Sequence, residues 1–510
     1  MDYTLEKKTV SVKETVFDGC AEQPVDLDLT LPDYCPDILR ILKCKVTPKI
    51  LNKSISGDRL DIEGSAGIKI LYIDAVKKAL RSSDHSIPFS SSFNMKQSPQ
   101  NGIVIASAKT EYVNCRALSP RRLDIHGAFS VCAKVVCKNG MEIPCDVQDE
   151  SVQVKKARAE ISVLEGMAQQ QFTLSDSVSL GSDAKNIEAI LKSDAVVSSG
   201  ECKALGNKIM IKGDVNIRVL YLADMNTGDT GIFDYTMPYS EILDADGVSE
   251  DSLCITSAEL VSHSVNIQQE YSQNGTVVNF EVKLSAYAFG YGREVLPFID
   301  DAYSTDIVLD MTYNHSDLMT IERYFSESCI TKASVETGSE SISSVTDIWC
   351  EQCVTGVLKE NDGIMIKGKL NMCILARNGE NIPFYSERVV EFTYPIPKTE
   401  DGMEAMAKGM VQSVSYRING GNKLDLRIET KLNITLVRNN QINYVSSVTS
   451  DSENKIKKDG SALILYYASQ GESVWNIAKE YAVSCKAVME ENELDSDKIS
   501  AHTVLFIPNV

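Results

Sequence analysis

Apolar and polar residues alternate along much of this 510-residue chain with the period of two that is typical of β-strands. Two clear examples are residues 60–64 (LDIEG) and 209–213 (IMIKG). Asp, Asn and Gly residues precede these runs, as they do in hairpin turns. The pattern therefore predicts antiparallel β-hairpins for most of the chain.

The same segment occurs three times. It reads GDRLDIEGSAGIKILYI from Gly57, GNKIMIKGDVNIRVLYL from Gly206 and NDGIMIKGKLNMCILAR from Asn361. An aromatic residue follows the central glycine of each copy after about 25 residues, at Phe89, Tyr239 and Phe392. A spacing of about 150 residues is too long for a solenoid repeat and matches a whole domain. We therefore predict three tandem repeat domains, at residues 1–155, 156–308 and 309–445.

Each repeat should be mainly antiparallel β-structure, folded as a sandwich or a partly open barrel. The central glycines interrupt a strand, as expected at a bulge or where another backbone approaches closely; they are Gly64, Gly213 and Gly368. Two short helices are also expected, around residues 36–43 and 184–192.

The last tenth of the chain has a different pattern. Residues 446–460 are polar and lack apolar periodicity, so we predict a linker. In residues 461–510 the pattern predicts a strand, two helices and a returning strand, at residues 463–467, 472–481, 484–491 and 503–508. Asn492 suits a left-handed stop after the second helix. The predicted order of this unit is βααβ.

This C-terminal unit resembles a LysM domain. The family pattern Y-x-V-x-x-G-D-T-L-x-x-I-A-x-x-Y is echoed by Tyr467, Gly471-Glu472-Ser473-Val474, Ile477-Ala478 and Tyr481. Residues 492–494 and 504–508 fit the rest of the pattern. His502-Thr503 stands where the family usually has Gly-Gln, which alters the loop that lines the family's glycan groove.

The triplicated unit is similar to the SPOCS domain of endospore-forming bacteria, and three such units followed by one LysM domain resemble the SipL-like family of spore-coat morphogenetic proteins. The resemblance implies a non-enzymatic scaffold at the forespore surface. It also implies a partner, the coat morphogenetic ATPase SpoIVA, recruited or tethered through the LysM domain. The alternative function that the LysM family implies is binding of peptidoglycan glycans that contain N-acetylglucosamine, and weak glycan binding is compatible with either function.

The net charge restricts the classes of partner. The chain has 51 Lys and Arg residues against 71 Asp and Glu, a net charge of −20 at pH 7. This argues against binding to nucleic acid or to anionic lipid, because both need a surplus of basic side chains. The N-terminal segment is charged and lacks the apolar core of a secretory signal, and no run approaches the roughly 18 apolar residues of a membrane span. We expect a cytoplasmic protein, in the mother cell by the family resemblance.

No motif in the chain indicates catalysis, a metal site or a cofactor. The string Trp349-Cys350-Glu351-Gln352-Cys353 mimics the W-C-x-x-C of thioredoxins, but the other repeats fill this position without the cysteine pair. We therefore interpret it as structural, and a cytoplasmic redox protein is the weakest hypothesis. No second C-x-x-C or H-x-x-x-H is present to complete a zinc site, the 5 histidines are scattered, and a Walker-type phosphate loop is missing from the sequence.

Two further residue classes receive structural interpretations. The other cysteines, among them Cys132, Cys137 and Cys373, lie in apolar strand-like runs and are expected to be buried, reduced thiols. Acidic pairs such as Asp300-Asp301 are interpreted as solvated charge rather than as the carboxylates of a glycosidase.

The strongest candidate for a binding surface lies on the first helix of the C-terminal unit. Val474, Ile477, Ala478 and Tyr481 are spaced as one buried stripe. Trp475 is about 100° away from that stripe, so we expect it at the edge, partly exposed. Such tryptophans anchor protein interfaces and stack on sugars, although a purely core-capping role is equally compatible with the spacing. The candidate partner-binding residues are Trp475, Leu463, Ile464, Ser473, Lys479 and Lys498.

Overall fold

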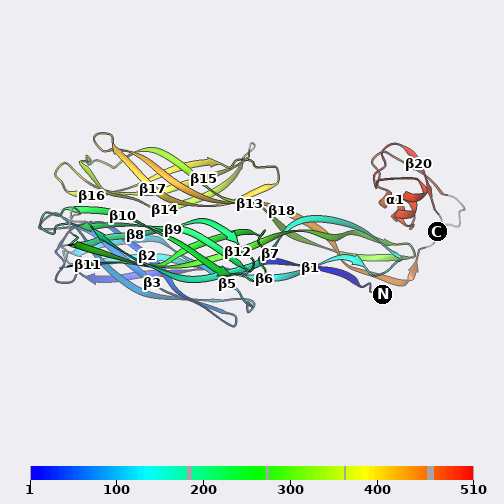
Figure 1. Ribbon diagram of the computed structural model, residues 1–510, viewed down its shortest axis with the longest axis horizontal. Coiled ribbons are helices and arrows are strands. Elements are labelled where there is room, and N and C mark those ends of the chain that lie inside the picture. The colour runs from blue at the N-terminus through cyan, green and yellow to red at the C-terminus, as the bar shows by residue number, and fades with distance from the viewer. Residues whose placement is uncertain (1, 181–186, 271–274, 361–362, 457–463, 509–510) are drawn as a thin grey trace.

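The computed structural model describes residues 2–180, 187–270, 275–360, 363–456 and 464–508. Within these residues the chain forms 20 strands and two short helices, and every paired strand is antiparallel (Figure 1). The mainly β prediction is therefore confirmed.

The first repeat consists of six strands in two three-stranded sheets. One sheet has the order β1-β6-β5 and the other β2-β3-β4. Buried side chains from both sheets, such as Ile62 and Phe129, belong to one apolar core, so the repeat is a sandwich. The strands are β1 Leu5–Thr30, β2 Ile38–Ser56, β3 Arg59–Asp74, β4 Leu80–Asn94, β5 Ile103–Ser119 and β6 Arg122–Val147.

The next two repeats have the same strand order. Their sheets are β11-β12-β7 with β10-β9-β8, and β13-β18-β17 with β14-β15-β16. Each repeat again encloses its own core. The strands are β7 Val152–Leu180, β8 Ala189–Ala204, β9 Lys208–Leu222, β10 Thr230–Asp244, β11 Leu253–Glu270, β12 Gly275–Ser304, β13 Ile307–Glu336, β14 Ser344–Glu360, β15 Gly363–Arg377, β16 Pro383–Pro395, β17 Met403–Ile418 and β18 Lys423–Lys455.

The C-terminal unit has the predicted βααβ order. Its elements are β19 Ile464–Ala468, α1 Val474–Glu480, α2 Cys485–Glu491 and β20 Thr503–Ile507. The two strands pair antiparallel, from Ile464 opposite Ile507 to Ala468 opposite Thr503. None of the helices in the part of the chain described here is long and apolar enough to cross a membrane.

The two short helices expected in the repeats are wrong. Residues 38–43 belong to β2 and residues 189–192 to β8, while residues 184–186 lie outside the described residues. The register of β2 against β3 shifts between Ile38 and Arg40 and again between Ile41 and Lys43, and β8 has the same kind of shift after Ile190. These bulges break the alternation of strand residues, so the apolar spacing imitates that of a helix.

The predicted linker is also partly wrong. β18 runs to Lys455 and pairs with β13 as far as Ile307, so residues 446–455 are strand. Only Val448 and Ser450 are buried among the described side chains just beyond residue 446, which explains why this strand has little apolar periodicity. Residues 457–460 lie outside the described residues.

The central glycines leave room for an aromatic ring on the neighbouring strand. Gly64 pairs with Phe89, and the same pairing recurs in the other repeats, Gly213 with Tyr239 and Gly368 with Phe392. A Cβ atom on Gly64 would overlap the carbonyl oxygen of Lys49 and lie 2.5 Å from a ring carbon of Phe89. The glycine is therefore required by a close backbone and an aromatic ring together.

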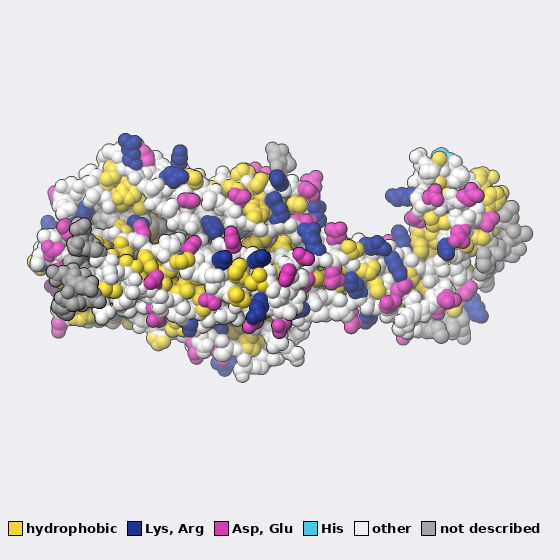
Figure 2. All heavy atoms as spheres, viewed as in Figure 1, with side chains coloured by type: hydrophobic (Ala, Val, Ile, Leu, Met, Phe, Trp, Pro, Cys, Tyr) yellow, Lys and Arg dark blue, Asp and Glu magenta, His cyan; other side chains and the backbone are white. Residues whose placement is uncertain are grey.

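The longest strands of the three repeats extend beyond the sandwiches and pack into a narrow shaft. The shaft consists of the outer parts of β1, β6, β7, β12, β13 and β18 (Figures 1 and 2). Its interior contains buried residues from every repeat, among them Ile143, Leu296 and Tyr444. The shaft is thus a joint product of the three repeats and ends close to the C-terminal unit (Figure 1).

The repeats also meet through the sheets β2-β3-β4, β10-β9-β8 and β14-β15-β16. We call this contact the axial cluster; it consists of Leu71, Leu220, Leu375, Lys192 and Asp347 with their contacts. The three leucines occupy the same position in the repeated segment and share one apolar cluster. Beside them, the Lys192 ammonium of the second repeat lies 2.6 Å from a carboxylate oxygen of Asp347 in the third. These side chains are only 4% and 0% exposed, so a buried ion pair joins the two repeats.

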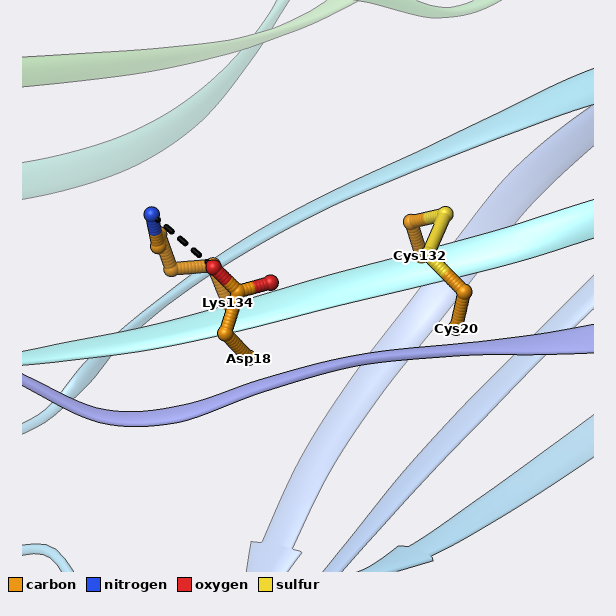
Figure 3. The surroundings of a disulfide bond; sticks show 4 residues. All are labelled: Asp18, Cys20, Cys132 and Lys134. Atoms are coloured by element: carbon orange, nitrogen blue, oxygen red, sulfur yellow. Dashed lines mark ion pairs between the residues drawn. A yellow bond between two sulfur atoms is a disulfide. The ribbon is translucent and has the colours of Figure 1, made fainter.

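A disulfide corrects the expectation that Cys132 is a reduced thiol. Cys132 in β6 lies directly opposite Cys20 in β1, and the two sulfur atoms are bonded (Figure 3). The pair lies near the surface rather than in the core, next to an ion pair between Asp18 and Lys134 at 3.0 Å. The pairing depends on the register of two strands that are far apart in sequence, which the spacing of cysteines does not reveal. Cys137 and Cys373 are buried free thiols, as expected.

Candidate functional site

The C-terminal unit is held together by a small core under its two helices. The predicted stripe is largely buried: Val474, Ile477 and Ala478 pack with Leu505 of β20. The start of α1 is held by Asp497, whose carboxylate accepts hydrogen bonds from the Ser473 hydroxyl at 2.9 Å and the Trp475 backbone N–H at 2.8 Å. A carboxylate at this end of a helix satisfies backbone donors that lack a partner inside the helix.

Asn492 does not provide the expected left-handed stop. Its φ is −106°, and the positive φ belongs to Glu493, at 51°. The Asn492 amide instead donates to the Val488 carbonyl at 2.8 Å and the Phe506 carbonyl at 2.7 Å. The residue therefore ends α2 through its side chain and ties the helix to β20.

Trp475 is more buried than the helical spacing predicts. It is 6% exposed, because its indole forms a T-shaped pair with the ring of Tyr303 in β12, with ring centroids 4.8 Å apart. Tyr303 belongs to the same apolar cluster as the core of the C-terminal unit. The expectation of a partly exposed tryptophan is thus wrong. Helical spacing describes the C-terminal unit alone, whereas Trp475 is covered by a residue of the shaft.

Asp301 of β12 is the polar centre of this contact. The Trp475 Nε1–H donates to one carboxylate oxygen at 2.8 Å, and the Lys479 ammonium lies 2.7 Å from both oxygens. The Tyr313 hydroxyl adds a third donor at 3.1 Å. Burial alone would raise the pKa of Asp301, but the hydrogen bonds from Lys479 and Trp475 outweigh it and hold that pKa below its ordinary value. Asp301 is therefore a bound carboxylate, and its interpretation as solvated charge is wrong.

Two further hydrogen bonds complete the contact. The Tyr303 hydroxyl donates to the Val483 carbonyl at 2.7 Å, and burial raises the pKa of that hydroxyl. The Ser484 hydroxyl donates to the Gln153 side chain in β7 at 3.3 Å. We call this set of interactions the docking contact: Asp301, Tyr303, Tyr313 and Gln153 of the shaft with Trp475, Lys479, Val483 and Ser484 of the C-terminal unit.

The candidate residues do not form one surface. Trp475 and Lys479 lie together in the docking contact. Ser473 and Lys498 pair with each other as an isolated bridge between two loops. Ile464 is half-buried against the core, and Leu463 lies outside the described residues.

The sequence reasoning missed the shaft side of this site and one exposed apolar face. Leu465, Tyr467, Val504 and Phe506 lie on the outer face of the β19–β20 hairpin and are all exposed, Tyr467 by 77%. Strand alternation in residues 464–468 and 503–507 was the available signal for this face. Asp301 and Tyr303 carry no comparable signal, because their role depends on a contact between two domains that are far apart in the sequence.

The W-C-x-x-C string lies in the middle of β14, paired with β15. Burial raises the pKa of Cys350 to about 12 and that of Cys353 to about 11. A reactive redox cysteine needs the opposite shift, usually at a helix N-terminus. The geometry agrees with the structural interpretation of this string.

A cluster of possible metal ligands is already occupied by an ammonium group. Glu351, Cys373 and Glu387 have ligand atoms within 4.8 Å of one another. The Lys43 ammonium of the first repeat lies 2.8 Å from Glu351 and 2.6 Å from Glu387. The cluster therefore acts as an ion-pair contact between the first and third repeats.

Comparison with protein-family models identifies two kinds of domain. The model of the SPOCS domain of SipL matches residues 37–118 and 186–268, which lie in the first two repeats. The LysM domain model matches residues 466–508. No curated protein and no solved structure gave a significant match. The matches confirm the resemblance to SipL-like proteins with a C-terminal LysM domain, and the shared strand order extends the repeat to residues 307–455.

Proposed function

We propose that this protein is a non-enzymatic scaffold of spore-coat assembly, similar to SipL, whose LysM domain recruits the coat morphogenetic ATPase SpoIVA. The site of action would be the mother-cell cytoplasm, at the surface of the forespore. The observation that carries the proposal is the position of one LysM domain beside the end of a shaft built from all three repeats. Such an arrangement presents a small binding module away from a large body (Figure 2).

The architecture of the body supports a scaffold. The repeats share the interior of the shaft and the axial cluster, so they are joined over much of their length. Buried ion pairs such as Lys192 with Asp347 connect different repeats. A body of this kind is suited to holding partners at fixed separations.

The chemistry of the described residues supports a binding role. SPOCS and LysM are binding domains. The thiols of Cys350 and Cys353 have raised pKa values, and the carboxylates of Glu351 and Glu387 are paired with Lys43. These thiols and carboxylates therefore take part in structural contacts.

The partner surface that we propose is centred on Trp475 and Lys479, the two candidate residues that lie together in this structure. Trp475 has the size and the hydrogen-bond donor of an interface anchor, and Lys479 supplies charge beside it. Both side chains face the shaft in this structure, so a partner gains access to them when the docking contact opens.

The test is binding of purified SpoIVA to the immobilised full-length protein. We expect saturable binding, and Trp475→Glu should abolish it while the β-sheet signal in circular dichroism is retained. Tyr467→Glu is the matched control, because it places the same charge on the outer face of the same domain. Binding that survives Trp475→Glu but not Tyr467→Glu would show that the wrong face was chosen.

Glycan binding is the second candidate function, because the LysM model matches residues 466–508. It is tested by sedimentation of the full-length protein with insoluble peptidoglycan. Retention on peptidoglycan without SpoIVA binding would overturn the scaffold proposal in favour of a glycan-binding protein.

A further inference from the structure

We infer that the face of the LysM domain formed by Trp475, Lys479 and the Val483 carbonyl is a recognition site for a peptide segment with a carboxylate and an aromatic ring two residues apart. In this structure Asp301 and Tyr303 of the shaft occupy that site as an internal ligand. The inference rests on the proposed function only for the identity of the external partner.

The carboxylate is recognised by two donors of different kinds. The Trp475 indole N–H contacts one oxygen of Asp301, and the Lys479 ammonium contacts both. Hydrogen bonds with an ionised partner are shorter and stronger than those between neutral groups. The pair of donors lies one helical turn apart on α1, at positions i and i+4, so the helix itself fixes their separation.

The aromatic ring is recognised by a second set of contacts. The Tyr303 ring and the Trp475 indole form a T-shaped pair, and the Tyr303 hydroxyl donates to the Val483 carbonyl at 2.7 Å. Trp475 therefore contacts both elements of the segment, the carboxylate through Nε1 and the ring through its apolar surface. One tryptophan at the centre of such a site is the arrangement expected of an interface anchor.

An extended strand presents the two elements together. Asp301 and Tyr303 are two residues apart in β12, so their side chains point to the same side of the strand. Ala302, between them, belongs to the apolar interior of the shaft. The ligand motif is thus Asp-x-Tyr on an extended backbone, a form that other proteins can also display.

The docking contact is polar and small compared with the contacts that join the repeats. Among the described residues, the shaft side chains that contact the LysM domain in it are Asp301, Tyr303 and Gln153, whereas the repeats share whole apolar clusters. Interfaces between domains that are polar and limited in area permit relative motion. Internal and external segments with the Asp-x-Tyr chemistry would then exclude one another, because both need Trp475 and Lys479.

The first arm of the test measures the internal contact. The chain has 2 tryptophans, so Trp349→Phe leaves Trp475 as the only one. In that background, Asp301→Asn should increase quenching of Trp475 by acrylamide severalfold, and Lys479→Gln should do the same from the other side. Asp300→Asn is the matched control, since Asp300 pairs with Lys155 at 3.2 Å and has no ion pair with the described part of the LysM domain. Equal quenching in the Asp300 and Asp301 variants would overturn the internal ligand.

The second arm measures recognition in trans. A peptide with the sequence of residues 298–304, FIDDAYS, is added to the full-length Asp301→Asn variant. We expect saturable protection of Trp475 from acrylamide, and none with the peptide in which Asp301 is replaced by Asn. A site that is opened by Asp301→Asn but protected by neither peptide would show that the face packs without recognising the motif.

The third arm connects the site to the partner. Asp301→Asn should bind SpoIVA more tightly than the wild-type chain, because the internal ligand no longer competes. Unchanged affinity, with Trp475 exposed and the peptide bound, would overturn the exclusion of one ligand by the other. If no variant binds SpoIVA while the peptide still binds, the proposed partner fails and the recognition site stands.

Discussion

Removing the Asp347 carboxylate tests whether the axial cluster joins the repeats into one body. Asp347 receives the Lys192 ammonium at 2.6 Å and the Arg218 Nε–H at 2.9 Å, both from the second repeat. Its side chain is 0% exposed and that of Lys192 only 4%. Asp347→Ala therefore leaves a buried ammonium that has lost its shortest partner.

The expected loss follows from that burial. Breaking a buried pair by removing one partner costs about 3–5 kcal/mol, since the remaining charge stays desolvated. Lys192 retains Asp194 at 3.0 Å, which offsets part of the penalty. We expect the free energy of unfolding to fall by about 3 kcal/mol, the lower end of that range.

The assay is urea unfolding followed through Trp349. This indole lies 3.4 Å from the Lys192 ammonium, measured to the ring centroid, and is buried. A Trp475→Phe background makes Trp349 the only tryptophan, so its emission reports the axial cluster. The midpoint and slope of the transition give the change in stability.

Asp234→Ala is the matched control, because Asp234 pairs with the same arginine, Arg218, at 3.2 Å but is 64% exposed. An exposed pair contributes about 0–1 kcal/mol, so this variant should be nearly neutral. Replacing both members of the buried pair, Lys192→Met with Asp347→Leu, should recover much of the loss. If Asp347→Ala costs no more than Asp234→Ala, the ion pair does not join the repeats.

Three further predictions concern other parts of the molecule. Gly64→Ala should lower the free energy of unfolding by about 1–3 kcal/mol, because its Cβ would overlap Lys49 and Phe89; Gly67→Ala, in the same strand with its nearest neighbour 3.7 Å away, should leave urea stability unchanged or higher. Cys350, whose pKa burial raises to about 12, should react with a disulfide reagent at pH 8 far more slowly in the folded chain than in urea, and equal rates would contradict its burial. The pKa of Asp301 is lowered in the folded chain. The docking contact therefore contributes its full stability at pH values above 3.8, the ordinary pKa, and loses it as the pH falls through the folded pKa. Trp475 quenching should therefore rise only in acid, and a rise near neutral pH would point to another group among those facing Asp301.

Much of the architecture was predictable from local pattern. The period of two identified strands, and three aligned copies of one segment identified the repeat without any knowledge of its topology. The LysM unit was predictable because its helices and strands are short and its buried stripe is regular. The pairing of each central glycine with an aromatic residue was visible in the sequence as an offset of about 25 residues, although its reason, a ring lying over the glycine, was not.

The errors have one physical origin, which is contact between distant segments. Bulges in β2 and β8 shift the register against a neighbouring strand, and a single strand read alone then resembles a helix. The helical spacing predicts a partly exposed Trp475 because the residue that covers it, Tyr303, comes from another domain. The bond between Cys20 and Cys132 depends on the alignment of β1 and β6 in the same way.

The axial cluster shows that covalent fusion has made the three repeats chemically unequal. Lys43, Lys192 and Asp347 occupy the same place in the repeat, each paired opposite the shared leucine. In a ring of three separate identical chains, that place would hold three like charges, which repel one another in a buried setting. Within one chain the places differ, so a cation of one repeat meets an anion of another. The contacts between repeats therefore differ from one pair to the next, and the body has three different flanks where a symmetric trimer would have three identical ones.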